Sequence, residues 1–168
     1  MDMPENTEES TITYVVDAPR DVVWKAWTDS RQLAQWLAPK GMTTISCTVD
    51  LRLGGLCHHG MTTPDGQESW AKFVYREIIP PEKLMYVVSL SDPQGETVRH
   101  FTRAWPLEVL DTTTFSEQDG KTTITSRSIP INATDHEREV FEANREPMRQ
   151  MSYEMLLQLD EYLKNVKS

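Results

Sequence analysis

The chain has few of the features that mark a secreted or membrane-spanning protein. Its 168 residues include only two cysteines, Cys47 and Cys57, too few for the disulfide framework of a small secreted domain. Its uncharged apolar stretches are only a few residues long and cannot span a bilayer. Residues 1–10 are acidic and polar and lack the basic and apolar regions of a secretory signal. We therefore expect a disordered lead-in over residues 1–10 and a single cytoplasmic domain over residues 11–168.

Positive charge is also scarce. The chain carries 17 Lys and Arg against 26 Asp and Glu, a net charge of −9, and has no run of Lys and Arg. Nucleic acids and anionic lipids both require a concentrated cationic surface. We therefore expect no nucleic-acid partner and no membrane insertion. Neighbouring strands could bring Cys47 and Cys57 together, but in a cytoplasmic chain we expect two buried thiols.

Strand patterns recur along the chain from Thr11 to Ile129. Thr11–Val16 is β-branched and aromatic, and Pro19 follows it. Two short helices are predicted next, with inward faces formed by Val23, Ala26 and Trp27 and by Leu33, Trp36 and Leu37. Six strand segments separated by turn signals predict an antiparallel meander. They are Thr43–Arg52, Leu56–Thr62, Trp70–Ile79, Leu84–Leu90, Leu107–Phe115 and Thr122–Ile129.

The last part of the chain is helical. Thr134 and Glu137 have the spacing of a capping box, and Pro147 predicts a break or kink with a new first turn beside it. Beyond the break, apolar residues recur every three or four positions and form one stripe. The stripe comprises Met148, Met151, Met155, Leu159, Tyr162 and Val166. This long helix is the element large enough to cover the sheet, and a curved sheet around one helix leaves room for a cavity.

Several short motifs occur in the order and spacing of one known superfamily. They are Ala18-Pro19, Val23-Trp24, Thr28-Asp29, Leu33-Ala34-Gln35-Trp36, Asp50-Leu51-Arg52-Leu53-Gly54-Gly55, Tyr75-Arg76-Glu77-Ile78, Pro80-Pro81-Glu82-Lys83-Leu84 and Gly120-Lys121-Thr122-Thr123-Ile124-Thr125. With these motifs the chain resembles the helix-grip (SRPBCC) superfamily of START domains and polyketide cyclases, from about Thr11 to Leu163. Within it, the chain is similar to bacterial homologues of the C-terminal domain of the activator of the heat-shock chaperone ATPase.

The resemblance implies an α+β helix-grip fold, a seven-stranded curved antiparallel sheet (β-α-α-β6-α) wrapped around a long C-terminal helix. Members bind lipids, polyketides, hormones or proteins, and some catalyse cyclisation, so the fold alone does not select a function. Two departures from the family pattern concern the expected cavity. Met151-Ser152 stands where the family has Gly-Trp, and Phe73-Val74 where many relatives have Gly. Loss of the Trp at Ser152 should leave more room under the long helix.

The sequence contains no strong catalytic or metal signature. Cys57-His58-His59 is the densest cluster of ligating residues, but neighbours on a strand point to opposite faces, so the two histidines cannot easily share a metal. We expect one histidine to face solvent and one the cavity. Gly54-Gly55 lacks the Gly-Lys-Ser/Thr of a phosphate loop and predicts a tight turn or bulge instead. We expect no metal, no cofactor and no assigned catalytic residue.

These observations favour a module that binds a small, mostly apolar molecule as a carrier, sensor or scavenger. We predict a cavity wall formed by Trp36, His58, Trp70, Tyr75, Trp105, Met151 and Met155. The alternative is a protein-interaction domain that assists a chaperone, and a third hypothesis is an enzyme of the cyclase or hydrolase kind. We expect a monomer or a homodimer.

Overall fold

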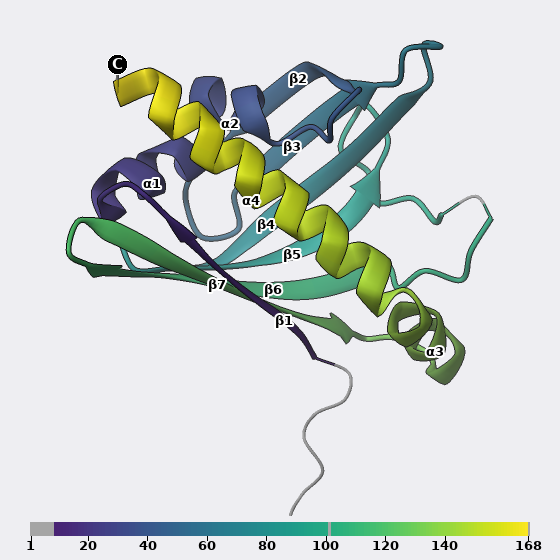
Figure 1. Ribbon diagram of the computed structural model, residues 1–168. Helices are drawn as coiled ribbons and strands as arrows, with labels where there is room; N and C mark the ends of the chain where they lie inside the picture. Colours follow the sequence, from purple (N-terminus) through teal and green to yellow (C-terminus); the bar gives the residue numbers. More distant parts are fainter. Residues whose placement is uncertain (1–8, 101, 168) are drawn as a thin grey trace, which may run out of the picture.

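One antiparallel sheet and four helices make up the part of the protein that the structure, a computed structural model, describes, residues 9–100 and 102–167 (Figure 1). The strands are β1 (Ser10–Val16), β2 (Thr43–Val49), β3 (Leu56–Thr62), β4 (Glu68–Ile79), β5 (Lys83–Ser91), β6 (Glu108–Gln118) and β7 (Lys121–Ile131). They lie in the order β1-β7-β6-β5-β4-β3-β2, so β2 to β7 form a meander and β1 joins it beside β7. The predicted fold class is confirmed.

The helices are distributed along the concave face of the sheet. They are α1 (Arg20–Thr28), α2 (Ser30–Trp36), α3 (Asp135–Ala143) and α4 (Arg145–Lys167). The long helix α4 crosses the sheet, with α1 and α2 near one of its ends and α3 at the other (Figure 1). Asp29 separates α1 from α2, because its carboxylate accepts from the backbone N–H of Arg31 (2.9 Å) and of Gln32 (3.4 Å) and so caps α2. Within the described ranges, no helix has both the length and the apolar character needed to cross a membrane.

Two sequence expectations at the ends of elements need adjustment. The proposed lead-in over residues 1–10 lies mostly outside the described residues, and Ser10 already belongs to β1. The strand predicted over Thr43–Arg52 ends at Val49, because Gly54 and Gly55 form a tight turn after it. Gly54 adopts a φ of +78°, and a Cβ on Gly55 would lie 2.1 Å from the carbonyl oxygen of Asp50. The glycine pair is thus a turn, as predicted.

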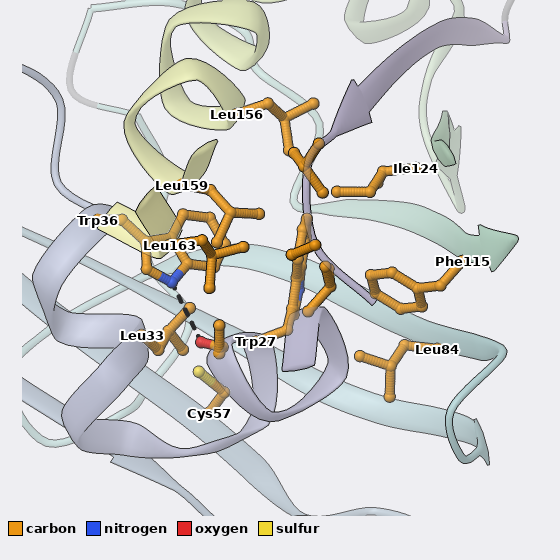
Figure 2. Packing of buried hydrophobic residues seen from close by; sticks show 14 of the residues in the cluster. Trp27, Leu33, Trp36, Cys57, Leu84, Phe115, Ile124, Leu156, Leu159 and Leu163 are labelled. Carbon is orange, nitrogen blue, oxygen red and sulfur yellow. Dashed lines mark hydrogen bonds between the residues drawn. The ribbon is translucent and has the colours of Figure 1, made fainter. Parts of the chain in front are cut away.

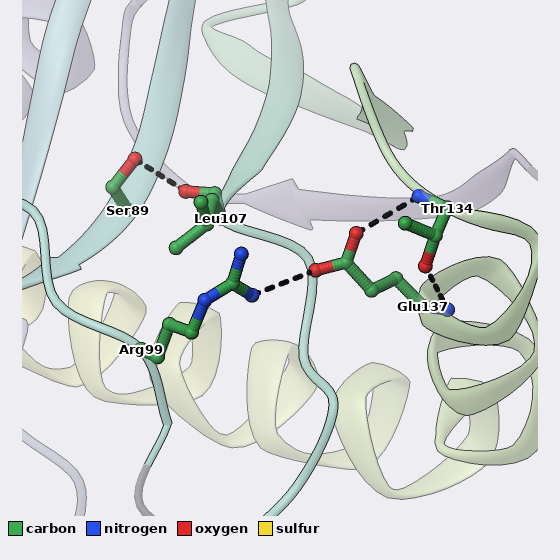
Figure 3. A network of polar contacts seen from close by, with 5 residues as sticks. All are labelled: Ser89, Arg99, Leu107, Thr134 and Glu137. Carbon is green, nitrogen blue, oxygen red and sulfur yellow. Dashed lines mark hydrogen bonds and ion pairs between the residues drawn. The ribbon is translucent and has the colours of Figure 1, made fainter.

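The capping box predicted for the C-terminal region begins α3. The Thr134 hydroxyl accepts from the backbone N–H of Glu137 (3.1 Å), and the Glu137 carboxylate accepts from the backbone N–H of Thr134 (2.8 Å). The break between the two helices lies at Asn144, and Pro147 stands in the first turn of α4, where a helix does not need its N–H. Arg99, from the connection between β5 and β6, donates to Glu137 over 3.2 Å and ties that connection to α3 (Figure 3).

The hydrophobic core lies between the concave face of the sheet and helices α1, α2 and α4 (Figure 2). Leu156, Leu159 and Leu163 project from α4 into this core and are at most 2% exposed. The predicted stripe is correct at Leu159 but wrong at Met151 and Val166, which are 57% and 59% exposed. The inward face instead runs through Ser152, Leu156, Leu159 and Leu163. Met151 precedes Ser152 by one residue and is therefore turned by about 100° around the helix.

Candidate binding cavity

Two adjoining cavities lie under α4, on the concave face of the sheet. The larger has a volume of about 180 Å³ and the smaller about 80 Å³. Both are lined by Trp27, Tyr86, Asp111, Ser152 and Met155. These residues come from α1, β5, β6 and α4, so the space is formed where the helices meet the middle of the sheet. Because they share these walls, we treat the two cavities as one candidate site.

Aromatic and aliphatic side chains form most of the wall of the larger cavity. Besides the shared residues it is lined by Leu33, Leu37, Cys57, Phe73 and Tyr75. The rings of Phe73 and Tyr86 lie 5.3 Å apart between centroids, and those of Tyr75 and Tyr86 lie 6.3 Å apart in an edge-on arrangement. Apolar walls with a few polar groups are characteristic of small-molecule sites.

The smaller cavity is more polar. Ser10, Ser126 and Ser128 line it from the neighbouring strands β1 and β7, and Arg149 lines it from α4. The Arg149 guanidinium lies near Glu146 on the same helix, with 3.4 Å between Nη1 and Oε1. This part of the site therefore offers hydroxyl groups and one cation, whose buried Nε has no partner among the described residues.

Asp111 is the acidic side chain that both cavities share. In the sheet it lies opposite Tyr86 of β5 and Ser128 of β7, so its side chain projects from the concave face. Its Oδ1 atom is buried and has no hydrogen-bond partner among the described residues. Burial raises the pKa of Asp111 to about 7, and a hydrogen bond with Ser128 opposes this shift. A buried carboxyl oxygen without a donor is unfavourable and marks a position where a ligand could supply one.

The other ionisable groups in the larger cavity stay neutral near pH 7. Burial raises the pKa of the Cys57 thiol to about 12 and shifts the pKa values of Tyr75 and Tyr86 upward in the same way. Cys57 is therefore a poor nucleophile, since the thiolate is the reactive form. Cys47 and Cys57 are both free, as expected. Within the described part of the chain, no group of three or more His, Cys, Asp and Glu residues is arranged to hold a metal ion.

The comparisons with known proteins bear on this fold and site. The sequence model of the Activator of Hsp90 ATPase homolog 1-like proteins (AHSA1) matches residues 17–164, most of the chain. The chain belongs to the AHSA1-like family. This family is part of the helix-grip superfamily, so the resemblance noted in the sequence is confirmed. A comparison with the curated proteins finds no match.

Solved structures share the AHSA1-like fold at low sequence identity. A crystal structure of a Mycobacterium smegmatis protein is similar with a TM-score of 0.77 and 22% identity, covering 94% of this chain and 91% of that one. A solution NMR structure of an Arthrobacter aurescens protein is similar with a TM-score of 0.78 and 23% sequence identity, and the match covers 98% of this chain and 90% of that one. The crystal structure of the AHSA1 protein from Silicibacter pomeroyi is similar with a TM-score of 0.70 and 14% sequence identity, and the match covers 93% of this chain and 97% of that one. At these identities the likeness concerns the fold alone.

Two of the seven residues predicted to line the cavity of this AHSA1-like chain do so. Tyr75 lines the larger cavity, and Met155 lines both. The two departures from the family pattern also border it, since Ser152 lines both cavities and Phe73 the larger. Room under α4 therefore exists where the family's Trp would stand.

Three of the predicted residues lie elsewhere on helices and loops. Trp36 does not line the cavity and is only 1% exposed. Its indole Nε1 donates to the carbonyl oxygen of Ala26 (3.1 Å), and its ring packs on Trp27 (Figure 2). Trp105 packs on Phe141 of α3, with 5.5 Å between ring centroids. Met151 lies on the exposed side of α4. Trp36 thus supports the cavity from behind rather than lining it.

His58 and Trp70 lie on the opposite face of the sheet from the cavity. Their rings stack with 4.9 Å between centroids, and His58 Nε2 lies 3.1 Å from the hydroxyl oxygen of Ser91. His59 points to the concave face instead, where it is 2% exposed and lies 3.0 Å from the Thr44 hydroxyl oxygen through Nε2. The prediction that the two histidines face opposite ways is confirmed, but the inward one is His59. Pairing with β4, which places Trp70 beside Gly60, sets this phase.

Sequence reasoning missed Trp27 and Asp111 as cavity residues. Trp27 was assigned to the core, and it lies at the boundary between core and cavity. The sequence did indicate that Asp111 faces the cavity. Residues of β6 point alternately to the two faces of the sheet, and the inward positions are Val109, Asp111, Thr113 and Phe115. A carboxylate on the inward face of an alternating strand is costly to bury, which makes it a candidate functional residue.

Proposed function

We propose that this AHSA1-like protein binds a small, mostly apolar molecule in the cavity between the sheet and α4. The observation that carries the proposal is the partly open space itself, which Ser152 borders with a small side chain within an otherwise packed core. Protein interiors contain few voids larger than a water molecule, so a space of this size is a candidate binding site. The aromatic and aliphatic wall suits an apolar body, and the polar end around Asp111 would orient it.

Propylbenzene is a suitable first probe because it is apolar and small. Its binding should be measurable at micromolar concentrations by isothermal titration, and it should quench tryptophan emission because Trp27 lines the site. Ser152→Trp should fill the space and weaken binding at least tenfold, about 1.4 kcal/mol, without lowering the melting temperature. Met151→Trp adds the same ring on the exposed side of α4 and should leave binding unchanged.

Two results would contradict this function. The first is a wild-type protein that binds no apolar probe. The second is a Ser152→Trp variant that unfolds, because the site would then already be packed at core density.

A chaperone-associated role is the second candidate. The observation in its favour is the turn between β2 and β3, where Leu51 is 38% exposed and Leu53 is 66% exposed. Exposed apolar groups of this kind can serve as protein contacts. An ATPase assay with a purified chaperone tests it: stimulation that Leu53→Ser abolishes would support the role, and no stimulation would contradict it.

A further inference from the structure

The carboxyl group of Asp111 has an acceptor position that the protein leaves open. Oδ1 is buried and receives no hydrogen bond within the described residues, and Asp111 lines both cavities, while a hydrogen bond with Ser128 acts on the carboxyl group. An unsatisfied buried acceptor costs free energy in the empty protein. A ligand that brings a donor to this position removes that cost on binding.

The walls around Asp111 favour a donor that carries positive charge. Trp27, Phe73, Tyr75 and Tyr86 line the larger cavity with aromatic rings, and Asp111 is its one charged residue among the described residues. Aromatic faces attract ammonium groups, and the attraction is stronger where the contact is desolvated. The net charge of −9 also attracts cations to the protein and repels anions.

One other charged group, Arg149, lines the site, and it lies only in the smaller cavity. Its Nη1 lies 3.4 Å from Oε1 of the exposed Glu146, and its buried Nε has no partner among the described residues, so the larger cavity is the part of the site that suits a cation. Cys57 on β3, Tyr75 on β4 and Tyr86 on β5 remain neutral below pH 9, since burial raises the pKa of each. The walls from α1, α2, β1 and β7 contribute only apolar groups and hydroxyls. Asp111 is therefore the group in the site that titrates near neutrality.

We propose that the ligand is a small organic cation, an amine or quaternary ammonium with an apolar body, whose charged group pairs with Asp111 while its body lies against the aromatic wall. This inference rests on the proposed function and narrows it to one ligand class. It also implies a direction for the pH dependence. Because the cation pairs with the carboxylate form, binding must strengthen as Asp111 loses its proton, between about pH 5.5 and pH 8.

Three probes of matched shape test the proposal: 2-phenylethylamine, propylbenzene and 3-phenylpropanoate. They differ mainly in the terminal group, which is a cation, a methyl or an anion, and an alkylammonium stays charged well above pH 8. Isothermal titration should show the amine bound at least tenfold more tightly than propylbenzene at pH 8, and the anion more weakly than both. The affinity for the amine should rise at least fivefold from pH 5.5 to pH 8, while that for propylbenzene should stay constant.

Asp111→Asn is the decisive variant, because it keeps the shape of the side chain and removes the charge. It should retain propylbenzene binding and lose both the preference for the amine and its pH dependence. Glu108→Gln is the matched control: it removes one charge from the same strand, outside both cavities, and should leave all affinities unchanged.

The outcomes separate the two proposals. If propylbenzene binds but the amine binds no better, or the anion binds best, the cation proposal is overturned and the cavity function stands. If Asp111→Asn retains the preference for the amine, the cation lies elsewhere and the proposal is likewise overturned. If none of the three probes binds the folded wild-type protein, both proposals are wrong.

Discussion

The side chain of Gln158 donates from Nε2 to the carbonyl oxygen of Trp36 over 2.8 Å, and so joins the middle of α4 to the end of α2. The same nitrogen lies 2.8 Å from the carbonyl oxygen of Ala38. Trp36 is the last residue of α2 and Ala38 lies just beyond its C-cap, so both carbonyl groups stand where a helix runs out of its own N–H donors. Leu33 and Leu37, which line the larger cavity, belong to the same segment. The side-chain amide of Gln158 therefore holds α4, which lies over the cavity, to the α2 segment that lines it.

Gln158→Met should weaken this join. The methionine keeps the volume of the side chain but leaves the two carbonyl groups without their donor, so the free energy of unfolding should fall by about 1–2 kcal/mol. Urea denaturation measures the change. Gln150→Met is the control, because Gln150 lies on the exposed side of α4 and its amide donates to Glu154 of the same helix (3.3 Å). Equal stability of the two variants would show that the join contributes nothing.

Leu159→Asp should unfold the protein or come close to it. Leu159 is fully buried at the centre of the core, and an unpaired carboxylate there costs several kcal/mol against a total stability of about 5–15 kcal/mol. Leu157→Asp places the same group on the outer side of α4, where the native side chain is 47% exposed. It should change the stability by about 0.5 kcal/mol or less. Thermal melts of both variants would reveal an error in the helix phase if their effects were reversed.

Asp111→Asn should stabilise the empty protein at pH 8. Burial raises the pKa of Asp111 from 3.8 to about 7, so the folded state holds this proton more tightly than the unfolded chain does. The contribution of this group to stability is present below about pH 4 and is lost as the pH rises towards 7, by a few kcal/mol at most. The variant should therefore melt higher than wild type at pH 8, and the difference should disappear near pH 4. A constant difference across this range would contradict a buried, uncompensated carboxylate.

Glu137→Ala should weaken the start of α3. The variant loses both the bond to the backbone N–H of Thr134 and the ion pair with Arg99, at a cost of about 1 kcal/mol. The bonds from Thr134 and Arg99 hold the pKa of Glu137 below its usual value, so its stabilising effect should be present at pH 7 and decline as the pH falls below about 4. Glu139→Ala, an exposed position on the same helix, should have little effect. Unfolding curves at pH 7 and pH 3 test both statements.

The parts of the fold that sequence predicted well depend on local interactions. The capping box needs only Thr134 and Glu137, and the turn after β2 needs only the backbone freedom of Gly54 and Gly55. The order of strands follows from turn residues within a few positions of each strand end. Such features are encoded within short segments, so their outcome does not depend on the rest of the chain.

The cavity wall was harder to predict because it depends on which face each residue occupies. In β3 the sequence Cys-His-His-Gly has no alternation of apolar and polar residues, so its pairing with β2 and β4 decides that His59 rather than His58 points inward. In α4 the flexible, apolar Met151 fits the helical spacing as well as Ser152 does, yet the helix turns Ser152 towards the sheet. Both errors concern which residues of an element face the sheet's concave side. Contacts between segments distant in the sequence decide this.

The pairing of β1 with β7 also sets the order in which the molecule can assemble. Ser10 lies beside Ser128, and about a hundred residues separate the two strands along the chain, which is the kind of long loop closure that slows folding. While the protein is being synthesised, β1, α1 and α2 are made long before β7 and α4 leave the ribosome. Until then Trp27 and Leu33 have neither β7 nor α4 as partners, and they are exposed to association with other apolar surfaces. The cavity between the sheet and α4 can therefore form only once α4 has emerged.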